Sequence, residues 1–214
     1  FIPLDRPPES LSKSFHRTCV RQRITRSKQS SIDISRGATA SDVDEFYSLY
    51  LMSRKQLGLP PQPVAFFRAL FDTFHPQRRV AMLFARKDGL AIGSLILFKF
   101  NSRVSCEFAV WNEKYIGISP LHGLFWEAIQ AAYREGFKIF DFGRTSPDNH
   151  TLMDFKNRWG TQVIDLPIFC YPKNNSACIT NKMLMAKRIV REVCRAVPDP
   201  IFEAFGKFLY RHMG

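Results

Sequence analysis

The stretch that decides the fold is RRVAMLFARKDGLAIGSLILFKFNSRVSCEFAVW, residues 78–111. Before it, apolar residues recur at helical spacing, whereas here they form short runs typical of β-strands. Asp88-Gly89 is a strong signal for a hairpin turn, and Asn101-Ser102-Arg103 marks a second turn. The stretch therefore predicts a meander of three antiparallel strands over residues 79–111.

A helix and a further strand follow the meander. The segment SPLHGLFWEAIQAAYREGF, residues 119–137, keeps helical spacing of its apolar residues, begins with a proline and ends at Gly136. The segment KIFDFG, residues 138–143, predicts a strand. Because a strand–helix–strand crossover brings its two strands together in parallel, the strand ending at Trp111 and this strand should be parallel neighbours.

Other elements are expected on both sides of this region. Before it, we expect a helix over residues 8–29, a strand at 30–35, a helix over 38–58 capped by Thr39 or Ser41, and a helix over 64–74. After it, we expect a short helix carrying Phe155 to Trp159 and ended by Gly160, and then a strand over 162–172. Two helical pieces, split at 198–200, form the tail. This order is typical of the α+β class, with a mixed sheet and flanking helices. We expect one such domain over residues 1–175 and a basic helical extension over residues 176–214.

Composition narrows the class of protein. A chain of 214 residues with 45% apolar residues and 20 phenylalanines can bury a proper core, which argues against disorder. The net charge of +12 favours anionic partners such as phosphates, nucleic acid or an anionic surface. The five cysteines are widely spaced without a CxxC pair, and there is no HExxH motif. We therefore expect reduced thiols, a cytoplasmic protein and no metal site.

Charged side chains gather where the parallel strand ends, in FDFGRTSPDNHTLMDFKNRWG, residues 140–160. In open sheets, ligands bind at the carboxyl ends of strands, beside helix N-termini. This rule places the site near residues 111–121 and 141–148. Arg144 follows a strand end and a glycine, so it either contacts an anionic ligand or forms a salt bridge with Asp141 or Asp154.

Several segments together carry a family resemblance. They are RQRITRSKQS (21–30), FYSLYLMSRKQLGLPPQP (46–63), ARKDGLAIGSLILF (85–98), the helix at 119–137, FDFGRTS (140–146) and FKNRWG (155–160). In order and spacing they resemble the second GNAT-like domain of FemAB/FemX-type proteins, also called BioF2-like acetyltransferase domains, over residues 1–172. The tail AVPDPIFEAFGKFL (196–209) is similar to the subgroup found with exopolysaccharide export systems.

The resemblance implies a GNAT fold and an N-acyltransferase. Founding members of this family transfer an amino acid from aminoacyl-tRNA to an amine of a peptidoglycan precursor, and relatives use acyl-CoA. It therefore implies acyl or aminoacyl transfer to an amine of a cell-envelope precursor or surface polysaccharide, with no bound cofactor and with tRNA or CoA as the anionic donor. It also implies a second GNAT-like domain in a longer chain. The basic, apolar tail suggests contact with the inner membrane face.

The resemblance also implies residue roles. Lys156 matches the lysine of the family's FK motif, which stabilises negative charge during acyl transfer; the alternative is a solvated helix lysine. Phe155 packs or lines the acyl pocket, and Trp159 is an aromatic anchor. The remaining substrate-binding candidates are Arg158, for phosphate or ribose hydroxyls, Asp141 and Arg144 at the strand end, and Trp111 and Tyr115 at the cleft mouth.

Glu107 is the second catalytic candidate. It lies within SCEFAVW, and GNAT enzymes often place a general base on this strand, where a carboxylate accepts the amine proton directly or through water. Strand alternation places Glu107 on one face with Ser105 and Ala109, opposite Phe108. The resemblance by itself does not single Glu107 out.

One segment departs from ordinary acetyltransferases. Those bind the donor's pyrophosphate with a glycine-rich loop, whereas this chain has YIGISPLHG, residues 115–123, in which Pro120 lacks an N–H. This favours a tRNA-like donor, or a second function as a non-catalytic anion-binding scaffold. The basic helix suits an RNA or phosphosugar backbone but has no interleaved aromatic residues. Its basic residues are Arg17, Arg21, Arg23, Arg26 and Lys28.

Overall fold

The computed structural model describes all residues except 168, 170–189 and 213–214. The chain divides into two compact units. The first contains residues 1–50 and 64–162, and the second contains residues 51–63 and 163–214. The sheet and the candidate site lie in the first unit, so the description concentrates on that unit.

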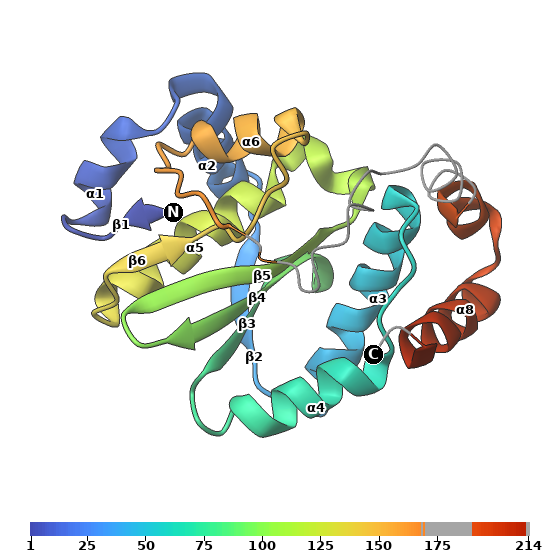
Figure 1. The fold of residues 1–214 in the computed structure, drawn as a ribbon. Coiled ribbons are helices and arrows are strands. Elements are labelled where there is room, and N and C mark those ends of the chain that lie inside the picture. The colour runs from blue at the N-terminus through green and yellow to red at the C-terminus, as the bar shows by residue number, and fades with distance from the viewer. Residues whose placement is uncertain (168, 170–189, 213–214) are drawn as a thin grey trace. The chain divides into compact units, whose positions relative to one another are not determined.

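The first unit is built on a six-stranded sheet in the order β1-β6-β5-β4-β3-β2 (Figure 1). Its strands are β1 (Ile2–Pro3), β2 (Asp33–Gly37), β3 (Val80–Lys87), β4 (Leu90–Phe100), β5 (Arg103–Trp111) and β6 (Ile139–Asp141). Neighbouring strands are antiparallel except β5 and β6, which are parallel. The predicted meander and the predicted parallel crossover are both confirmed.

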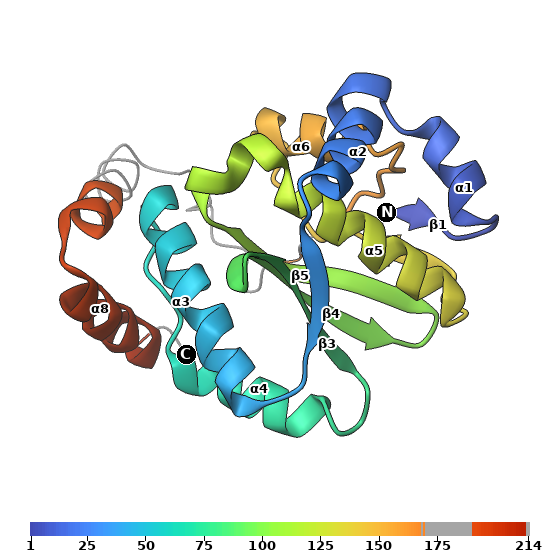
Figure 2. The same ribbon diagram turned by 180° about the vertical axis from the view of Figure 1, so that it is seen from behind.

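Helices cover both faces of this sheet (Figures 1 and 2). One face carries α3 (Ala40–Leu57) and α4 (Val64–Phe74), and the other carries α2 (Gln22–Gln29), α5 (Pro120–Arg134) and α6 (His150–Asn157). The N-cap of α3 is Thr39, whose Oγ1 accepts the N–H of Asp42 at 3.2 Å. The Asp42 carboxylate in turn accepts the N–H of Thr39 at 2.8 Å, which completes a reciprocal cap.

The N-terminal segment is not the single helix that residues 8–29 predicted. It is divided into α1 (Pro8–Leu11), the 3₁₀ turn η1 (Ser12–Ser14), the π-helical turn η2 (Arg17–Arg21) and α2. The break lies at Phe15, whose backbone is extended and whose ring is buried against Trp126 and Trp159. Packing of this ring into the core outweighs helical continuity, and His16 starts the next turn by accepting the N–H of Cys19.

The predicted strand over residues 162–172 was also wrong where the structure describes it. Residues 162–167 form no strand, and Val163, Ile164 and Leu166 are exposed. The edge of the sheet beside β6 is already occupied, because β1 pairs with β6 through Ile2 and Phe140. Residues 168 and 170–172 lie outside the described residues.

The second unit contains the end of α3, the segment that follows it and the described tail. Residues 190–196 are helical, and α8 (Asp199–His212) follows, so both tail helices predicted around residues 198–200 are present. Arg195 Nε donates to the carbonyl of Gln56 at 3.3 Å. A Cβ on Gly206 would lie 2.2 Å from the carbonyl oxygen of Pro61, so α8 packs closely on this segment.

The main core lies between α5 and the sheet. Its fully buried side chains include Leu95, Leu124, Ile129, Phe140 and Trp159. Aromatic rings fill the opposite face of the sheet, where Phe46, Tyr50 and Phe67 contact Phe108 of β5. Buried phenylalanines thus contribute to the packing on both faces of the sheet.

Gly123 permits the close packing of α2 against α5. A Cβ at this position would lie 2.3 Å from Ser27 Oγ and 3.2 Å from Ser27 Cβ. We expect Gly123→Ala to lower the free energy of unfolding by about 1–3 kcal/mol, as overpacking does elsewhere. Chemical denaturation measures this change.

Gly117→Ala is the matched control, because Gly117 is exposed and a Cβ there meets nothing within 4 Å. Adding Ser27→Gly to Gly123→Ala should recover part of the lost stability. Equal stabilities for Gly123→Ala and Gly117→Ala would show that the two helices do not need this close approach.

Candidate active site

Two features of β5 open the sheet beside β6. The parallel pairing of β5 and β6 ends at Ser105 and Asp141, although β5 continues to Trp111. Past this point β5 has a bulge at Glu107, which has no partner on β4. The residues on either side of it are paired, Cys106 with Leu97 and Phe108 with Ile96. The two parallel strands therefore separate at the carboxyl end of β6, where the sequence placed the site.

Helix α6 brings Lys156 to this point. Its Nζ donates a hydrogen bond of 2.6 Å to the carbonyl oxygen of Gly143, two residues beyond the end of β6. Burial lowers the pKa of Lys156, while the negative charge of Asp141 counteracts this lowering. Lys156 is therefore a half-buried cation fixed at the strand end, in contrast to a solvated helix lysine.

Asp141 is held on both of its carboxylate oxygens. Oδ2 accepts Arg103 Nη1 at 2.9 Å, and Oδ1 accepts the N–H of Gly143 at 2.8 Å. The ion-pair partner of Asp141 is thus Arg103, because strand register places the two residues on neighbouring strands. The predicted alternative, a salt bridge between Arg144 and Asp141, is wrong. Arg144 is exposed and forms no ion pair within the described part of the chain. Its anion contact stays a prediction.

Glu107 is exposed at the bulge and accepts a hydrogen bond of 2.8 Å from Ser105 Oγ. The expected grouping with Ala109 was wrong, because the bulge interrupts strand alternation. Ala109 packs against the core under α5, together with Cys106, whereas Phe108 contacts the rings of α3 and α4. The role of Glu107 as a base stays a prediction.

Phe155 and Trp159 anchor α6 to the core. Phe155 is half-buried, and its ring lies 5.9 Å from that of Phe125 and 5.7 Å from that of His122. Trp159 has 0% of its surface exposed. Burial lowers the pKa of His122 to about 4, so this imidazole is a neutral packing group at pH 7. The lining of an acyl pocket by Phe155 stays a prediction.

The remaining candidates lie at the end of β5, in a 3₁₀ turn and at the end of α6. Trp111 ends β5, and Tyr115 lies in the 3₁₀ turn η3 (Glu113–Ile118), and both are half-buried. Arg158 is exposed, and its side chain lines a shallow groove with His16 and Asp154. Residues two apart on a helix point about 200° away from each other, so Arg158 and Lys156 face different directions. Ligand binding by these residues stays a prediction.

The first turn of α5 offers few donors to a phosphate group. Pro120 has no N–H, and the N–H groups of His122 and Gly123 both point to the carbonyl of Ser119. Ser119 has φ +59°, and its buried Oγ has no hydrogen-bond partner among the described residues. Gly123, one of the two glycines of this segment, serves the contact with α2.

Sequence reasoning missed three contributors to the site. Arg103 appeared only as a turn residue, Gly143 as a spacer, and Cys106 as one of five thiols. Burial raises the pKa of the Cys106 thiol to about 12, so it is not a thiolate nucleophile. The Asp-Phe-Gly sequence could have indicated the role of Gly143, because an aspartate side chain often accepts a hydrogen bond from the backbone N–H of the second residue after it.

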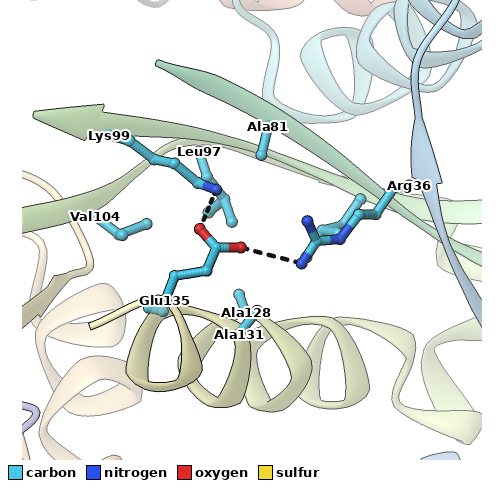
Figure 3. Close-up of a pocket in the computed structure, with 10 residues that line it drawn as sticks. Arg36, Ala81, Leu97, Lys99, Val104, Ala128, Ala131 and Glu135 are labelled. Carbon is cyan, nitrogen blue, oxygen red and sulfur yellow. Dashed lines mark hydrogen bonds and ion pairs between the residues drawn. The ribbon is translucent and has the colours of Figure 1, made fainter. Parts of the chain in front are cut away.

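A cavity under the far end of α5 is not the substrate site (Figure 3). Its volume is about 10 Å³, which is room for one water molecule at most. Small and aliphatic side chains line it, and Glu135 closes it with ion pairs to Lys99 and to Arg36, the latter at 3.2 Å. Three of the lining residues are alanines of α5: Ala128, Ala131 and Ala132.

The part of the chain that the structure describes has neither a candidate metal centre nor a candidate membrane span. No group of three or more His, Cys, Asp or Glu side chains there is arranged to hold a metal ion. Among the described helices, none combines the length and apolar character that crossing a bilayer requires.

Family and structural comparisons agree with this fold. The family model of the acetyltransferase (GNAT) domain matches residues 14–157. The chain belongs to the GNAT acetyltransferase family and is an acyltransferase domain. No curated protein matches the chain.

Solved structures show the same fold at low sequence identity. FemX matches with a TM-score of 0.69 and 15% identity over 75% of this chain, which spans 57% of the FemX chain. Aminoglycoside N-acetyltransferase AAC(6')-Iy, in complex with CoA, matches with a TM-score of 0.52 and 20% identity over 67% of this chain and 95% of its own. AAC(6')-Ih from Acinetobacter baumannii matches with a TM-score of 0.51 and 16% identity over 67% of this chain and 99% of its own.

Proposed function

We propose that this protein transfers an acyl or aminoacyl group to an amine of a cell-envelope precursor or a surface polysaccharide. The observation that carries the proposal is the half-buried Lys156 ammonium, held at 2.6 Å to the Gly143 carbonyl where β5 and β6 separate. A cation fixed in a partly desolvated place stabilises an oxyanion better than a solvated one does.

The reaction follows from ordinary acyl-transfer chemistry. The acceptor amine attacks the carbonyl carbon of the donor ester or thioester, and the new C–N bond forms as the carbonyl oxygen gains negative charge. Lys156 stabilises that charge, and the C–O or C–S bond to the donor then breaks. Glu107, exposed at the bulge, takes the amine proton directly or through water, and the leaving group gains a proton.

The donor is either acyl-CoA or aminoacyl-tRNA. AAC(6')-Iy, a protein of similar fold, binds CoA, which supports an acyl-CoA donor here. In this chain Pro120 and the inward bonds of His122 and Gly123 leave few donors for a pyrophosphate. The exposed basic residues of η2 and α2 instead suit a longer phosphate backbone. These contrasts favour the tRNA donor, with Arg144 and Asp141 near the transferred end. Arg158, which faces another direction than Lys156, would contact a phosphate or ribose further along the donor.

The test is a turnover assay with purified protein. Mass spectrometry follows acyl transfer from acyl-CoA or aminoacyl-tRNA to peptidoglycan precursors and amino sugars. We expect product from one donor, and salt-dependent turnover if that donor is tRNA. Tight binding of both donors without product would instead favour the non-catalytic anion-binding scaffold.

The same proposal extends to the cellular role of the protein. It includes a role in peptidoglycan or exopolysaccharide synthesis, a second GNAT-like domain, and contact of the basic tail with the inner membrane face. The tail residues Lys182, Lys187 and Arg188 lie outside the described residues. Sedimentation with anionic liposomes tests the last point, and equal binding by the chain with and without residues 176–214 would contradict it.

A further inference from the structure

The Lys156 ammonium is held by a neutral backbone carbonyl. Its one described hydrogen bond goes to Gly143 O at 2.6 Å. An ammonium group has three N–H donors, so this bond fixes its position and leaves donors for a substrate oxygen. The position of Lys156 therefore depends on the orientation of the Gly143 peptide group.

The backbone at Gly143 has little freedom. Its φ is +76°, a conformation that other residues rarely adopt, and a Cβ there would lie 3.1 Å from the carbonyl oxygen of Cys106. Its N–H donates to Asp141 Oδ1 at 2.8 Å. This bond closes a turn that begins at the last residue of β6 and orients the carbonyl that Lys156 contacts.

Asp141 is in turn fixed from the neighbouring strand. Arg103 begins β5, and its Nη1 donates to Asp141 Oδ2 at 2.9 Å, so each carboxylate oxygen has one partner. The carboxylate is only 23% exposed, which strengthens both contacts relative to a fully solvated pair. The contacts form one chain from Arg103 through Asp141 and Gly143 to Lys156.

We propose that Asp141 is a positioning residue for acyl transfer: with Arg103 it sets the Gly143 turn that holds Lys156, and its carboxylate places a negative charge near the Lys156 ammonium. The inference rests on the proposed function of Lys156. Burial lowers the pKa of Lys156, and Asp141 provides the largest opposing effect. A further titratable group near Lys156 is the Cys106 thiol on β5.

Two substitutions separate the two tasks of Asp141. Asp141→Asn keeps an oxygen for the Gly143 N–H but removes the charge, whereas Asp141→Ala removes both. We expect Asp141→Asn to retain most of the kcat at pH 7, with the alkaline limb of its pH profile shifted to lower pH, because Lys156 loses its proton more easily. We expect Asp141→Ala to lower kcat by about 10- to 100-fold with little change in KM.

Glu127→Gln is the matched control. It also removes a carboxylate paired with an arginine, since Glu127 accepts Arg134 Nη2 at 2.6 Å on α5. It should change neither the pH profile nor kcat. An unshifted profile in Asp141→Asn, or equal kinetics for Asp141→Ala and Glu127→Gln, would overturn the positioning role.

A readout without turnover distinguishes this failure from failure of the proposed function. Reductive ¹³C-methylation of the lysines allows the Lys156 resonance, assigned with Lys156→Arg, to be titrated by NMR. We expect its pKa to be lower in Asp141→Asn than in the parent or in Glu127→Gln. If this pKa difference is observed and Lys156→Ala still transfers the acyl group at the parent rate, only the proposed function is rejected. An unchanged Lys156 pKa would reject the Asp141 inference whatever the activity.

Discussion

Lys156→Ala is expected to lower kcat for acyl transfer by about 100- to 1000-fold, the loss seen when a preorganised oxyanion contact is removed. The protein should remain folded, because the Lys156 side chain is half-buried and makes its one described hydrogen bond to Gly143 O. Rates with the confirmed donor and acceptor, together with circular dichroism, check both parts.

The controls separate charge from position. Lys156→Arg keeps a cation of different shape, so it should recover part of the activity. Lys13→Ala removes an exposed lysine of η1 and should leave kcat unchanged. Unchanged transfer by Lys156→Ala, with product formation confirmed for the parent, would reject Lys156 as the stabilising cation.

Trp159→Ala is expected to lower the free energy of unfolding by about 3–5 kcal/mol, the range for large aromatic residues in cores. The Trp159 ring has no exposed surface and lies 5.3 Å from the ring of Phe15, 5.7 Å from that of Phe142 and 5.8 Å from that of Phe125. Urea denaturation measures the change. This one ring joins α6, β6, α5 and the N-terminal segment, so its loss leaves a large cavity at their junction.

Trp159→Phe should cost less, because a ring remains and the indole Nε1 has no hydrogen-bond partner within the described structure to lose. Phe100→Ala is the surface control, since Phe100 is 66% exposed and should change stability by no more than about 0.5 kcal/mol. Similar losses for Trp159→Ala and Phe100→Ala would show that Trp159 is not an anchor of the core.

The two predictions concern neighbouring residues with different tasks. Trp159 holds α6 against the core, and Lys156, one turn earlier, presents a charge to the strand end. We therefore expect Trp159→Phe to retain more transfer activity than Lys156→Ala, although the lysine substitution leaves the protein the more stable of the two. This difference distinguishes a chemical role from support of the fold.

Much of the fold was predictable because its signals are local. Asp88-Gly89 and the turn at residues 101–103 divided the meander, and the apolar spacing of residues 119–137 predicted α5. The predictions that were wrong involve contacts between distant parts of the chain. Phe15 breaks the N-terminal helix to pack against Trp126 and Trp159, and β1 occupies the sheet edge beside β6.

The candidate site shows the same difference between local sequence signals and contacts of distant residues. Lys156 was identified through the FK motif, but the motif contains nothing about Gly143, 13 residues earlier, which accepts its hydrogen bond. The salt-bridge partner of Asp141 could not be chosen from the sequence, because Arg144 is nearer along the chain and Arg103 is nearer across the sheet. The grouping of Ala109 with Glu107 failed because the bulge at β5 interrupts strand alternation.

The family resemblance supplied Lys156 as a candidate. The sequence by itself determined the α+β order of elements, the parallel crossover and the excess of positive charge. These depend on spacing and residue type, which are properties of short segments. Only the tertiary structure decided that Arg103, Asp141, Gly143 and Lys156 form one connected set. The reason is physical: strand register and the turn at Gly143 bring together groups that are far apart in the chain, and burial then gives their charges a strength that sequence alone does not reveal.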